Sequence, residues 1–373
     1  RYTVSSGHAS IDLDYQSITS LSLNGGTVKD IARNPANLNL FSPDSTGSLA
    51  ANKTIVVDGI IPEATSVSFV SNNPNLTSIA GPEEIVTLSL TTSEAIKTPT
   101  VTIGDVNATV TGNNTSWSIS RTMSSNDVSG NIVFTIDYVD LAGNSGIQIT
   151  SSTDGSAVIF DKTPPLITNV TSITPNGIYI VGQELTLSIN FNELVKVTGS
   201  PLLQLETGEI DRSASFHSAN YQVDSSIVFI YTVSAGDSSG DLDYKSTNSL
   251  MLNGGLIKDL AGNSANIILG NPGTNISLSG INNIIIDGIL PEVTGVMSTA
   301  FSDSTYIIGD MIPIQITFDD YVSVTGNPEL LLETGIVDGA AVYASGSGQN
   351  TLTFNYIVEN GQISSDLGYV ANS

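Results

Sequence analysis

Residues 185–191 read LTLSINF, with an apolar side chain at every second position. An alternation with a period of two predicts a β-strand that buries one of its faces. The same pattern recurs in VTLSL (86–90), NIVFTIDYV (131–139) and SIVFIYTV (226–233). Gly, Asn, Asp and Ser separate these stretches at turn spacing, and no stretch shows a sustained 3.6-residue period with helix caps. The sequence therefore predicts an all-β protein.

One sequence motif occurs in two similar copies, as NGGTVKDIARNPAN from residue 24 and as NGGLIKDLAGNSAN from residue 253. Asn253 lies 253 − 24 = 229 positions after Asn24. At this offset residues 1–61 align with residues 230–290 without a gap, and about half of the positions are identical. The repetition indicates an internal duplication, which has to be recognised before any fold is assigned.

A second offset links residues 179–208 to residues 306–335, because 306 − 179 = 127. The two offsets together divide the chain into copies of a long repeat, type A, and one copy of a shorter repeat, type B. The predicted units are the C-terminal part of a type A repeat (1–61), a complete type B repeat (62–163), a complete type A repeat (164–290) and the N-terminal part of another type A repeat (291–373).

Units of this size, built from short and evenly spaced strands, are typical of immunoglobulin-like (Ig-like) antiparallel β-sandwiches. We therefore expect an elongated array of Ig-like β-sandwich domains. Trp117, the single tryptophan, is expected in the core of the type B repeat. Residues 1–20 and 354–373 both correspond to about 230–249, which favours a window from a longer tandem array over a closed ring.

The composition excludes several partners. The 373 residues include 36 acidic and 11 basic side chains, for a formal charge of −25. Such a chain lacks the basic face that nucleic acids or an anionic lipid surface require. Cysteine is absent, which rules out disulfides, thiol catalysis and thiolate metal sites, and no apolar run approaches the roughly 18–20 residues of a membrane helix.

The sequence also argues against catalysis. The two histidines, His8 and His217, occupy non-equivalent positions of the repeats and neither lies in a nucleophile motif. No phosphate-binding loop, dinucleotide fingerprint or zinc spacing occurs. Pairs of carboxylates recur once in each unit near the linkers, which suits a structural role better than a glycosidase cleft. We therefore expect a protein that is not an enzyme.

Acidic residues recur at one pole of each predicted sandwich. In an Ig-like domain the incoming linker, the B–C loop and the F–G loop lie at the same end. With strand B of the complete type A repeat at 185–191, its B–C loop carries Asn192 and Glu193, and DLAGN (259–263) forms its F–G loop. The candidate ligands are Asp58, Glu94, Asp140 and Asn144 for type B, Asp161, Glu193, Asp259 and Asn263 for complete type A, and Asp287, Asp319 and Asp320 for the last repeat.

Three carboxylates close together repel one another, and Ca²⁺ relieves this repulsion by taking six to eight oxygen ligands. Mg²⁺ demands a stricter octahedron, so the mixed loop ligands favour the larger ion. The sequence therefore predicts a calcium ion that stiffens each junction between domains. The alternative is a plain turn, because Asp, Asn and Gly in DLAGN also suit a turn without any metal.

A second acidic run, GDSSGDLDY (236–244), is placed near the E–F turn at the opposite pole. It contains Asp237, Asp241 and Asp243, but the first unit has His8 where Asp237 would stand. This substitution favours a turn over a metal site. Tyr244 is expected to close the base of the sandwich.

The stretches VTGSPLLQLETG (197–208), YTVSAGDSSGDLDY (231–244) and IIIDGILPEV (284–293) resemble the tandem Ig-like repeats of giant bacterial surface proteins. These include large adhesins and the repeat named after a cyanobacterial swimming-motility protein. The type B repeat, which ends in FDKTPP, resembles the shorter Ig-like repeats of the same proteins. The resemblance covers essentially the whole chain and implies a secreted or cell-surface location and calcium dependence. Arg33 replaces the glycine of the AGN turn in the first unit, which weakens a metal role there.

These observations favour a non-catalytic stalk or filament segment of a bacterial surface protein that serves adhesion, motility or coat formation. Its expected partners are neighbouring Ig-like domains of the same chain or of adjacent protomers, and a surface glycan or protein receptor. One rival is a glycan- or protein-binding module with polar loops, although aromatic residues make up only 6% of the chain. The other rival is an accessory segment of a secreted enzyme.

Overall fold

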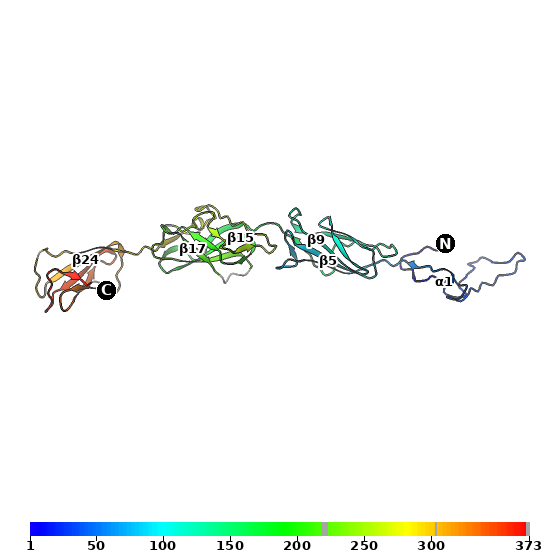
Figure 1. The fold of residues 1–373 in the computed structure, drawn as a ribbon, viewed down its shortest axis with the longest axis horizontal. Helices are drawn as coiled ribbons and strands as arrows, with labels where there is room; N and C mark the ends of the chain where they lie inside the picture. The colour runs from blue at the N-terminus through cyan, green and yellow to red at the C-terminus, as the bar shows by residue number, and fades with distance from the viewer. Residues whose placement is uncertain (218–222, 303, 371–373) are drawn as a thin grey trace.

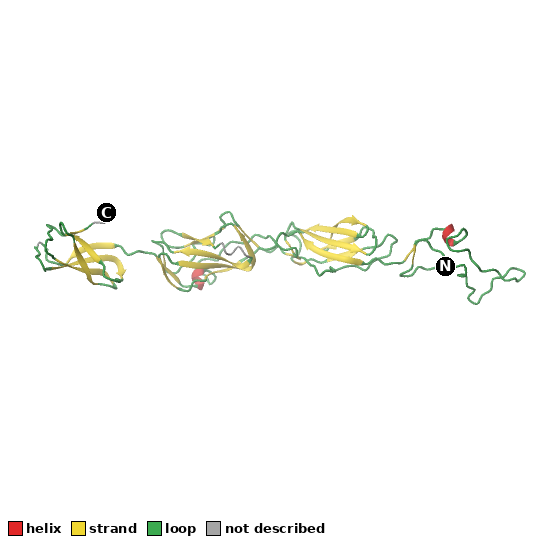
Figure 2. Ribbon diagram, turned by 90° about the horizontal axis from the view of Figure 1, so that it is seen from below, coloured by secondary structure: helices red, strands yellow, loops and turns green. Residues whose placement is uncertain are grey.

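The computed structural model describes residues 1–217, 223–302 and 304–370, and these lie in one elongated row (Figure 1). The blue end of the row holds the N-terminus and the red end holds the C-terminal strands. Strands dominate three of the four parts, whereas the part that holds the N-terminus is mostly loop (Figure 2). The four parts are called here the N-terminal segment (1–61), the short unit (62–163), the long unit (164–290) and the C-terminal segment (291–373).

The short unit is an Ig-like sandwich of two antiparallel sheets. One sheet has the strand order β3-β5-β9-β8 and the other has the order β11-β6-β7. A third ladder pairs β12 with β4 in parallel and with β10 in antiparallel orientation. The strands are β3 (Ala64–Ser71), β4 (Ile79–Ala80), β5 (Ile85–Thr92), β6 (Thr100–Ile103), β7 (Val106–Asn107), β8 (Thr109–Asn113), β9 (Ser116–Thr122), β10 (Gly130–Asn131), β11 (Phe134–Asp137) and β12 (Ile159–Phe160).

Alternating apolar residues of the two sheets fill the core of the short unit. In β5 the exposed fraction is at most 1% for Val86, Leu88 and Leu90, while their neighbours along the strand point outward. Trp117 packs in the same core with 8% exposure, as the sequence predicts. The period-two pattern therefore encodes the buried face directly.

The long unit has a seven-stranded sheet and a smaller three-stranded sheet. The smaller sheet has the order β14-β22-β19, with β22 parallel to β14. The elements of the long unit are β13 (Ile167–Ser172), β14 (Gly177–Ile180), β15 (Glu184–Thr198), β16 (Leu202–Leu205), β17 (Arg212–Phe216), β18 (Asp224–Thr232), β19 (Ser238–Ser239), β20 (Leu250–Met251), β21 (Leu256–Lys258), the short helix α2 (Leu278–Ile281) and β22 (Ile284–Asp287).

Strand β15 does not end in a loop at Asn192 and Glu193. It runs on to Thr198, and its pairing register with β18 shifts between Asn190 and Val195. Just beyond the shift Val195 still pairs with Asp224 of β18, and the last three residues of the strand pair with β21. A bulge bends and twists a strand, so the two parts of one strand can pair with different partners without a loop between them. The expected B–C loop is therefore a bulge, and Glu193 lies on it.

The C-terminal segment repeats the first half of the long unit. Its main sheet has the order β23-β24-β27-β26-β25-β28, and β24 carries a register shift between Thr317 and Val322 like that of β15. A small core surrounds Leu332, Phe354 and Tyr356. The strands are β23 (Val293–Ser298), β24 (Met311–Val322), β25 (Glu329–Glu333), β26 (Gly339–Ser345), β27 (Gln349–Ile357) and β28 (Gly368–Tyr369).

The N-terminal segment has little regular structure. It contains β1 (Ala9–Ser10), the short helix α1 (Leu49–Asn52) and β2 (Val57–Asp58). Several of its apolar side chains are open to solvent, with 63% exposure at Phe41 and 92% at Ile11. Among the residues described, no helix has the length and apolar character needed to cross a membrane.

Candidate cation sites at two junctions

The first carboxylate cluster lies between the N-terminal segment and the short unit. Asp58 ends β2, Glu94 follows β5 and Asp140 lies just beyond β11. One carboxylate oxygen from each residue lies within 4.8 Å of the other two. Oxygens that share one Ca²⁺ at 2.3–2.6 Å can be no more than about 5 Å apart. The three side chains could therefore bind the same ion.

The second cluster lies between the short and the long unit and repeats the first. Asp161 follows β12, Glu193 lies on the bulge of β15 and Asp259 directly follows β21. Their carboxylate oxygens also lie within 4.8 Å of one another. Each cluster thus takes one acid from the incoming linker, one from the end or bulge of a long strand and one from a DLAGN turn.

The DLAGN turn presents its aspartate in the same way at both junctions. The Asp140 carboxylate accepts hydrogen bonds from the backbone N–H of Asn144 at 2.8 Å and from its Nδ2 at 2.7 Å. The same amide donates to the backbone oxygen of Asp58 at 3.2 Å. Asn263 Nδ2 likewise donates to the Asp259 carboxylate. It also donates to the backbone oxygen of Asp161, at 3.1 Å. The amide nitrogen of each Asn therefore ties the turn to the linker of the preceding unit.

The glutamate of each cluster has a raised pKa. Burial raises the pKa of Glu94, and the nearby charges of Asp58 and Asp140 raise it further. Burial likewise raises the pKa of Glu193, with the charges of Asp259 and Asp161 adding to the effect. In both cases the ionised form is disfavoured by lost hydration and by like charges. A bound cation would remove both penalties.

The pKa values of the two DLAGN aspartates are shifted in opposite directions. At Asp140, burial acts to raise the pKa, but hydrogen bonds from Asn144 and the adjacent backbone outweigh burial and lower it. At Asp259, burial dominates over the same hydrogen bonds, and the charge of Asp161 adds to it, so the pKa is raised. The second cluster therefore holds its negative charge in a less favourable environment.

One oxygen in the first cluster has no protein partner. Glu94 Oε1 is fully buried, and no hydrogen bond reaches it from the described part of the chain. A buried carboxylate oxygen without a donor costs free energy. Glu94 also faces two further carboxylates, so this oxygen could serve as one ligand of a bound cation.

A direct contact between the short and long units accompanies the second cluster. Asn73 and Asn75, in the loop after β3, both donate from Nδ2 to the backbone oxygen of Leu260, at 3.0 and 3.2 Å. Lys196 Nζ of the long unit donates to Asn75 Oδ1 at 3.1 Å. These contacts were not predicted from the sequence, because the asparagines lie outside the repeated motifs.

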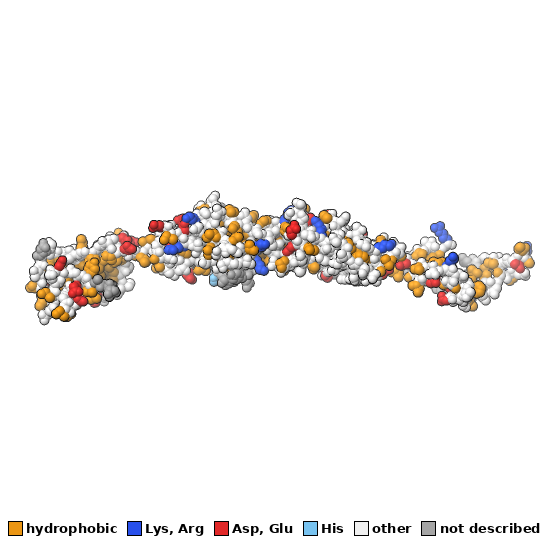
Figure 3. All heavy atoms as spheres, viewed as in Figure 1, with side chains coloured by type: hydrophobic (Ala, Val, Ile, Leu, Met, Phe, Trp, Pro, Cys, Tyr) orange, Lys and Arg blue, Asp and Glu red, His pale blue; other side chains and the backbone are white. Residues whose placement is uncertain are grey.

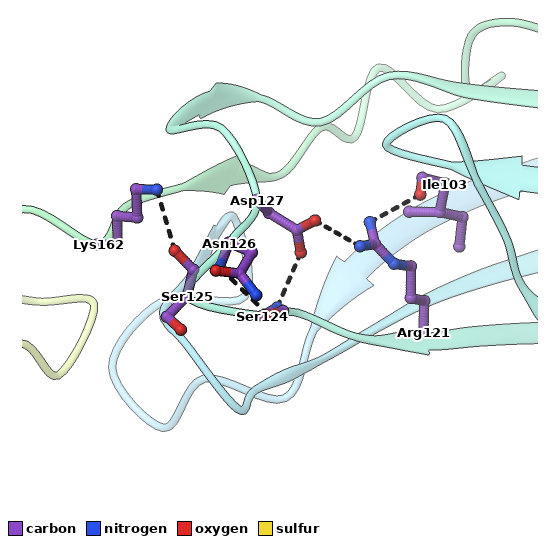
Figure 4. Close-up of polar contacts among 7 residues, drawn as sticks. All are labelled: Ile103, Arg121, Ser124, Ser125, Asn126, Asp127 and Lys162. Atoms are coloured by element: carbon purple, nitrogen blue, oxygen red, sulfur yellow. Dashed lines mark hydrogen bonds and ion pairs between the residues drawn. The ribbon is translucent and has the colours of Figure 1, made fainter.

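The tip of the long unit's DLAGN turn lies against Gly81 of the short unit. A Cβ atom added at Gly81 would lie 2.1 Å from the backbone oxygen of Ala261. Only glycine allows two backbones to approach so closely. The linker is held as well, because Lys162 Nζ donates to the backbone oxygen of Ser125 at 3.0 Å (Figure 4).

The loop that receives Lys162 is itself fixed within the short unit. Arg121 pairs with Asp127 at 2.5 Å and donates to the backbone oxygen of Ile103 at 2.8 Å (Figure 4). Asp127 also accepts from the backbone N–H of Ser124 at 2.8 Å. The pair therefore links β9, β6 and the loop after β9 into one support for the linker.

The structure brings together fewer acids at the third junction. Asp287, Asp319 and Asp320 are all exposed, and they form no three-carboxylate group among residues 1–217, 223–302 and 304–370. A group of acidic side chains marks this junction on the face shown in Figure 3. Asp319 instead ties the linker, since its Oδ1 accepts from the backbone N–H of Glu292 at 2.8 Å.

The second acidic run makes ordinary structural contacts. Asp237 accepts hydrogen bonds from Tyr231 at 2.7 Å and from Arg212 at 2.8 Å. Asp243 accepts from the backbone of Tyr244 at 2.8 Å and from the hydroxyl group of Ser279 at 2.6 Å. These contacts agree with the turn interpretation, and Tyr244 is 1% exposed in the core.

No protein-family model and no curated protein sequence matches the chain. Solved structures with some similarity include the I9–I11 tandem from titin, with 10% identity and a TM-score of 0.29. The match covers 76% of this chain and 87% of the tandem's chain. The full extracellular region of plexin A4 has 12% identity and a TM-score of 0.20, covering 82% of this chain and 22% of its own.

A third similar structure is SGBP-B of the Bacteroides ovatus mixed-linkage glucan utilization locus, in complex with a mixed-linkage heptasaccharide. It has 13% identity and a TM-score of 0.15, and the match covers 75% of this chain and 70% of that protein. The strand order of the chain itself establishes its architecture. The chain is an elongated tandem array of Ig-like antiparallel β-sandwiches.

Proposed function

We propose that the chain is a non-catalytic spacer, a stalk or filament segment, whose junctions are stiffened by calcium. The observation that carries this proposal is the repetition of one three-carboxylate group at two consecutive junctions. Each group joins an acid of the linker to two acids of the following unit. A cation bound there would hold two units in a fixed relative position.

Calcium suits these sites better than magnesium. The carboxylates come from a linker, a strand end or bulge and a turn, and the linker backbone oxygens lie alongside them. Ca²⁺ accepts such mixed oxygen ligands in variable geometry, whereas Mg²⁺ requires a near-ideal octahedron. The principal partners are then neighbouring Ig-like units, joined end to end.

The repeat motifs support a more specific role. Their resemblance to repeats of giant bacterial surface proteins favours a secreted or cell-surface location and service in adhesion, motility or coat formation. An extended row of sandwiches with stiff junctions is suited to holding a terminal domain away from a surface. Extracellular calcium would keep such sites filled, because modules of this kind bind at roughly 10⁻⁴–10⁻³ M.

Small-angle X-ray scattering and thermal unfolding, each in millimolar calcium and in excess chelator, test this proposal. Calcium should give a rigid rod with a higher unfolding midpoint, and chelator should give a flexible chain. At tenfold saturation each site would add about 1.4 kcal/mol to the free energy of unfolding. Scattering and unfolding curves that are unaffected by calcium would overturn the proposal, and the acidic turns would then be plain turns.

A further inference from the structure

Strand β8 forms one edge of the main sheet of the short unit, and the outer side of this strand has no partner. It pairs only with β9, and within the described part of the chain no other strand or loop forms a backbone–backbone hydrogen bond with residues 109–113. Four of these five residues are exposed. The unpaired N–H and C=O groups of this edge are therefore open to solvent.

The opposite edge of the same sheet is covered. The backbone N–H of Val67 on β3 donates to Thr153 Oγ1 at 2.8 Å, and that of Phe69 donates to Ser156 Oγ at 2.7 Å. In the long unit, residues 276–282 cover the edge strand β13 in a similar way. The chain thus covers β3 and β13 but leaves β8 bare.

The covered edge also shows which groups of β8 face outward. In an antiparallel sheet, the residues of a strand bond to its two neighbours in alternation. Val67 and Phe69 bond away from the sheet, and following the registers from β3 through β5 and β9 leaves Val110 and Gly112 facing outward on β8. These two residues offer a free N–H and C=O each.

The sheet behind this edge is almost free of charge, although the formal charge of the chain is −25. Strands β3, β5, β8 and β9 contain one charged residue, Arg121, and it pairs with Asp127. Their outer face consists mainly of Ser and Thr side chains. Two copies of an acidic chain repel each other over most of their surface, but no carboxylate lies on these strands. One row across this face is Ser68, Ser89, Ser118 and Thr111.

We propose that β8 pairs with β8 of a second copy of this chain, antiparallel about a two-fold axis at Thr111. An edge strand is complementary to a copy of itself in this orientation, because each free N–H meets a C=O. With Thr111 opposite its own copy, Val110 lies opposite Gly112, and the pair exchanges both backbone hydrogen bonds. The contact on each side of the axis is the same, so the pairing closes as a dimer.

Other registers satisfy fewer groups. A shift by two residues places Gly112 opposite Ala108, whose N–H already donates to the backbone oxygen of Val101. A shift in the other direction places Val110 opposite Asn114, whose backbone oxygen already accepts from Ile96. The register centred on Thr111 is therefore favoured.

Such a pairing would set two rows side by side in opposite directions, because the strands of the short unit run roughly along the row (Figure 2). Neighbouring strands are rotated by roughly 20–25° relative to each other, so the two rows diverge on either side of the contact. Stalks anchored on two facing surfaces meet in this orientation, which suits adhesion between like surfaces. That last step rests on the proposed function, whereas the pairing itself requires no cation and is tested in chelator.

A single cysteine can test the two-fold contact because the chain contains none. Thr111→Cys places two thiols in a non-hydrogen-bonded pair, with Cα atoms about 4.5 Å apart and within the span of a disulfide. The control is Ser118→Cys, exposed on the same face, whose two copies would lie about 14 Å apart. Under diamide oxidation, Thr111→Cys should form a covalent dimer and Ser118→Cys very little. Equal cross-linking of both variants, or none in either, would overturn the contact.

A mixture of two variants tests the antiparallel register. Thr109 should lie opposite Asn113 of the second copy, whereas two copies of Thr109 would be about 13 Å apart. An equimolar mixture of Thr109→Cys and Asn113→Cys should therefore give mainly the mixed dimer, identified by its intact mass. A predominance of dimers of Thr109→Cys with itself would mean parallel pairing and would overturn the proposed register.

Sedimentation of the full chain in chelator measures the contact without a disulfide. Wild type should form dimers as its concentration rises, and more of them at higher salt, because screening weakens the repulsion between acidic chains. Thr111→Asp should stay monomeric because it places like charges directly opposite each other, whereas Ser118→Asp should still dimerise. A wild type that stays monomeric at every concentration and salt, or two variants that behave alike, would contradict the pairing.

Discussion

The junctions on either side of the short unit have the same three-carboxylate group but differ in how closely the neighbouring units pack. At the first junction Leu141, at the tip of the DLAGN turn, is 65% exposed. At the second junction the equivalent Leu260 is half-buried, and Ala261 is only 5% exposed because it lies against Gly81. The same turn therefore serves an open junction in one place and a packed junction in the other.

This difference indicates that the carboxylates and the packing act separately. The second junction has direct hydrogen bonds from Asn73 and Asn75 that require no metal. The first junction has the bond from Asn144 to the linker and a cavity of about 700 Å³ lined by residues that include Asp58 and Ala142. Calcium should therefore restrict motion most at the first junction and add to an existing contact at the second.

The largest expected effect comes from Gly81→Ala. The new Cβ would meet the Ala261 backbone oxygen, which must move away, and overpacking of this kind costs about 1–3 kcal/mol. Spin labels at Thr111 and Ser213 should report a broader distance distribution across the second junction. Gly240→Ala, in open space, should leave it unchanged. A narrow distribution in both variants would show that the contact does not fix this junction.

Replacing the glutamates should remove calcium stabilisation one junction at a time. Glu94→Gln should abolish it at the first junction and Glu193→Gln at the second, a loss of about 1.4 kcal/mol at tenfold saturation. Calorimetry with and without calcium measures both effects. Glu209→Gln, an exposed acid of the long unit, serves as the control. If Glu94→Gln or Glu193→Gln kept the full stabilisation by calcium, the replaced glutamate would not be a ligand of the site.

In chelator Glu193→Gln should have the opposite effect and stabilise the protein. The pKa of Glu193 is raised above its ordinary value of 4.5, so its contribution to stability is present at low pH and is lost as the pH rises through the folded-state pKa. Glu193→Gln should thus be more stable than wild type at pH 7 and equal to it near pH 4. Chemical denaturation across this range measures the difference. A variant that is less stable than wild type at pH 7 would contradict a raised pKa.

The smallest effect is expected from Lys196→Ala. Its contact with Asn75 is exposed, and surface contacts of this kind contribute no more than about 0.5 kcal/mol. The distance distribution across the second junction should remain narrow, in contrast to Gly81→Ala. A broad distribution would mean that this contact, and not the close backbone approach, holds the units together.

Much of the fold and the carboxylate groups could be predicted because both repeat. Alternation in LTLSINF identified a buried strand face, and the DLAGN copies identified equivalent turns in successive units. The sequence could not reveal that Glu193 lies on a bulge, since the alternation of buried residues continues with the same parity on both sides of it. Asn73 and Gly81 were missed because their role arises only from the approach of the next unit.

The third junction was only partly predictable for the same reason. Asp287, Asp319 and Asp320 were grouped by their repeat positions, but the acid of the DLAGN turn has no counterpart in residues 291–373. The structure accordingly leaves them exposed and uses Asp319 to tie the linker. Position in a repeat predicts which residues are equivalent, but not whether their side chains lie close enough to share one ion.

Distance distributions between spin labels across each junction, in calcium and in chelator, test the central claim most directly. Because the chain has no cysteine, labels can be placed at Thr46 and Thr111 for the first junction and at Thr111 and Ser213 for the second. The account predicts that calcium narrows a broad distribution at the first junction and changes the second much less. Distributions that are the same with and without calcium at both junctions would contradict it.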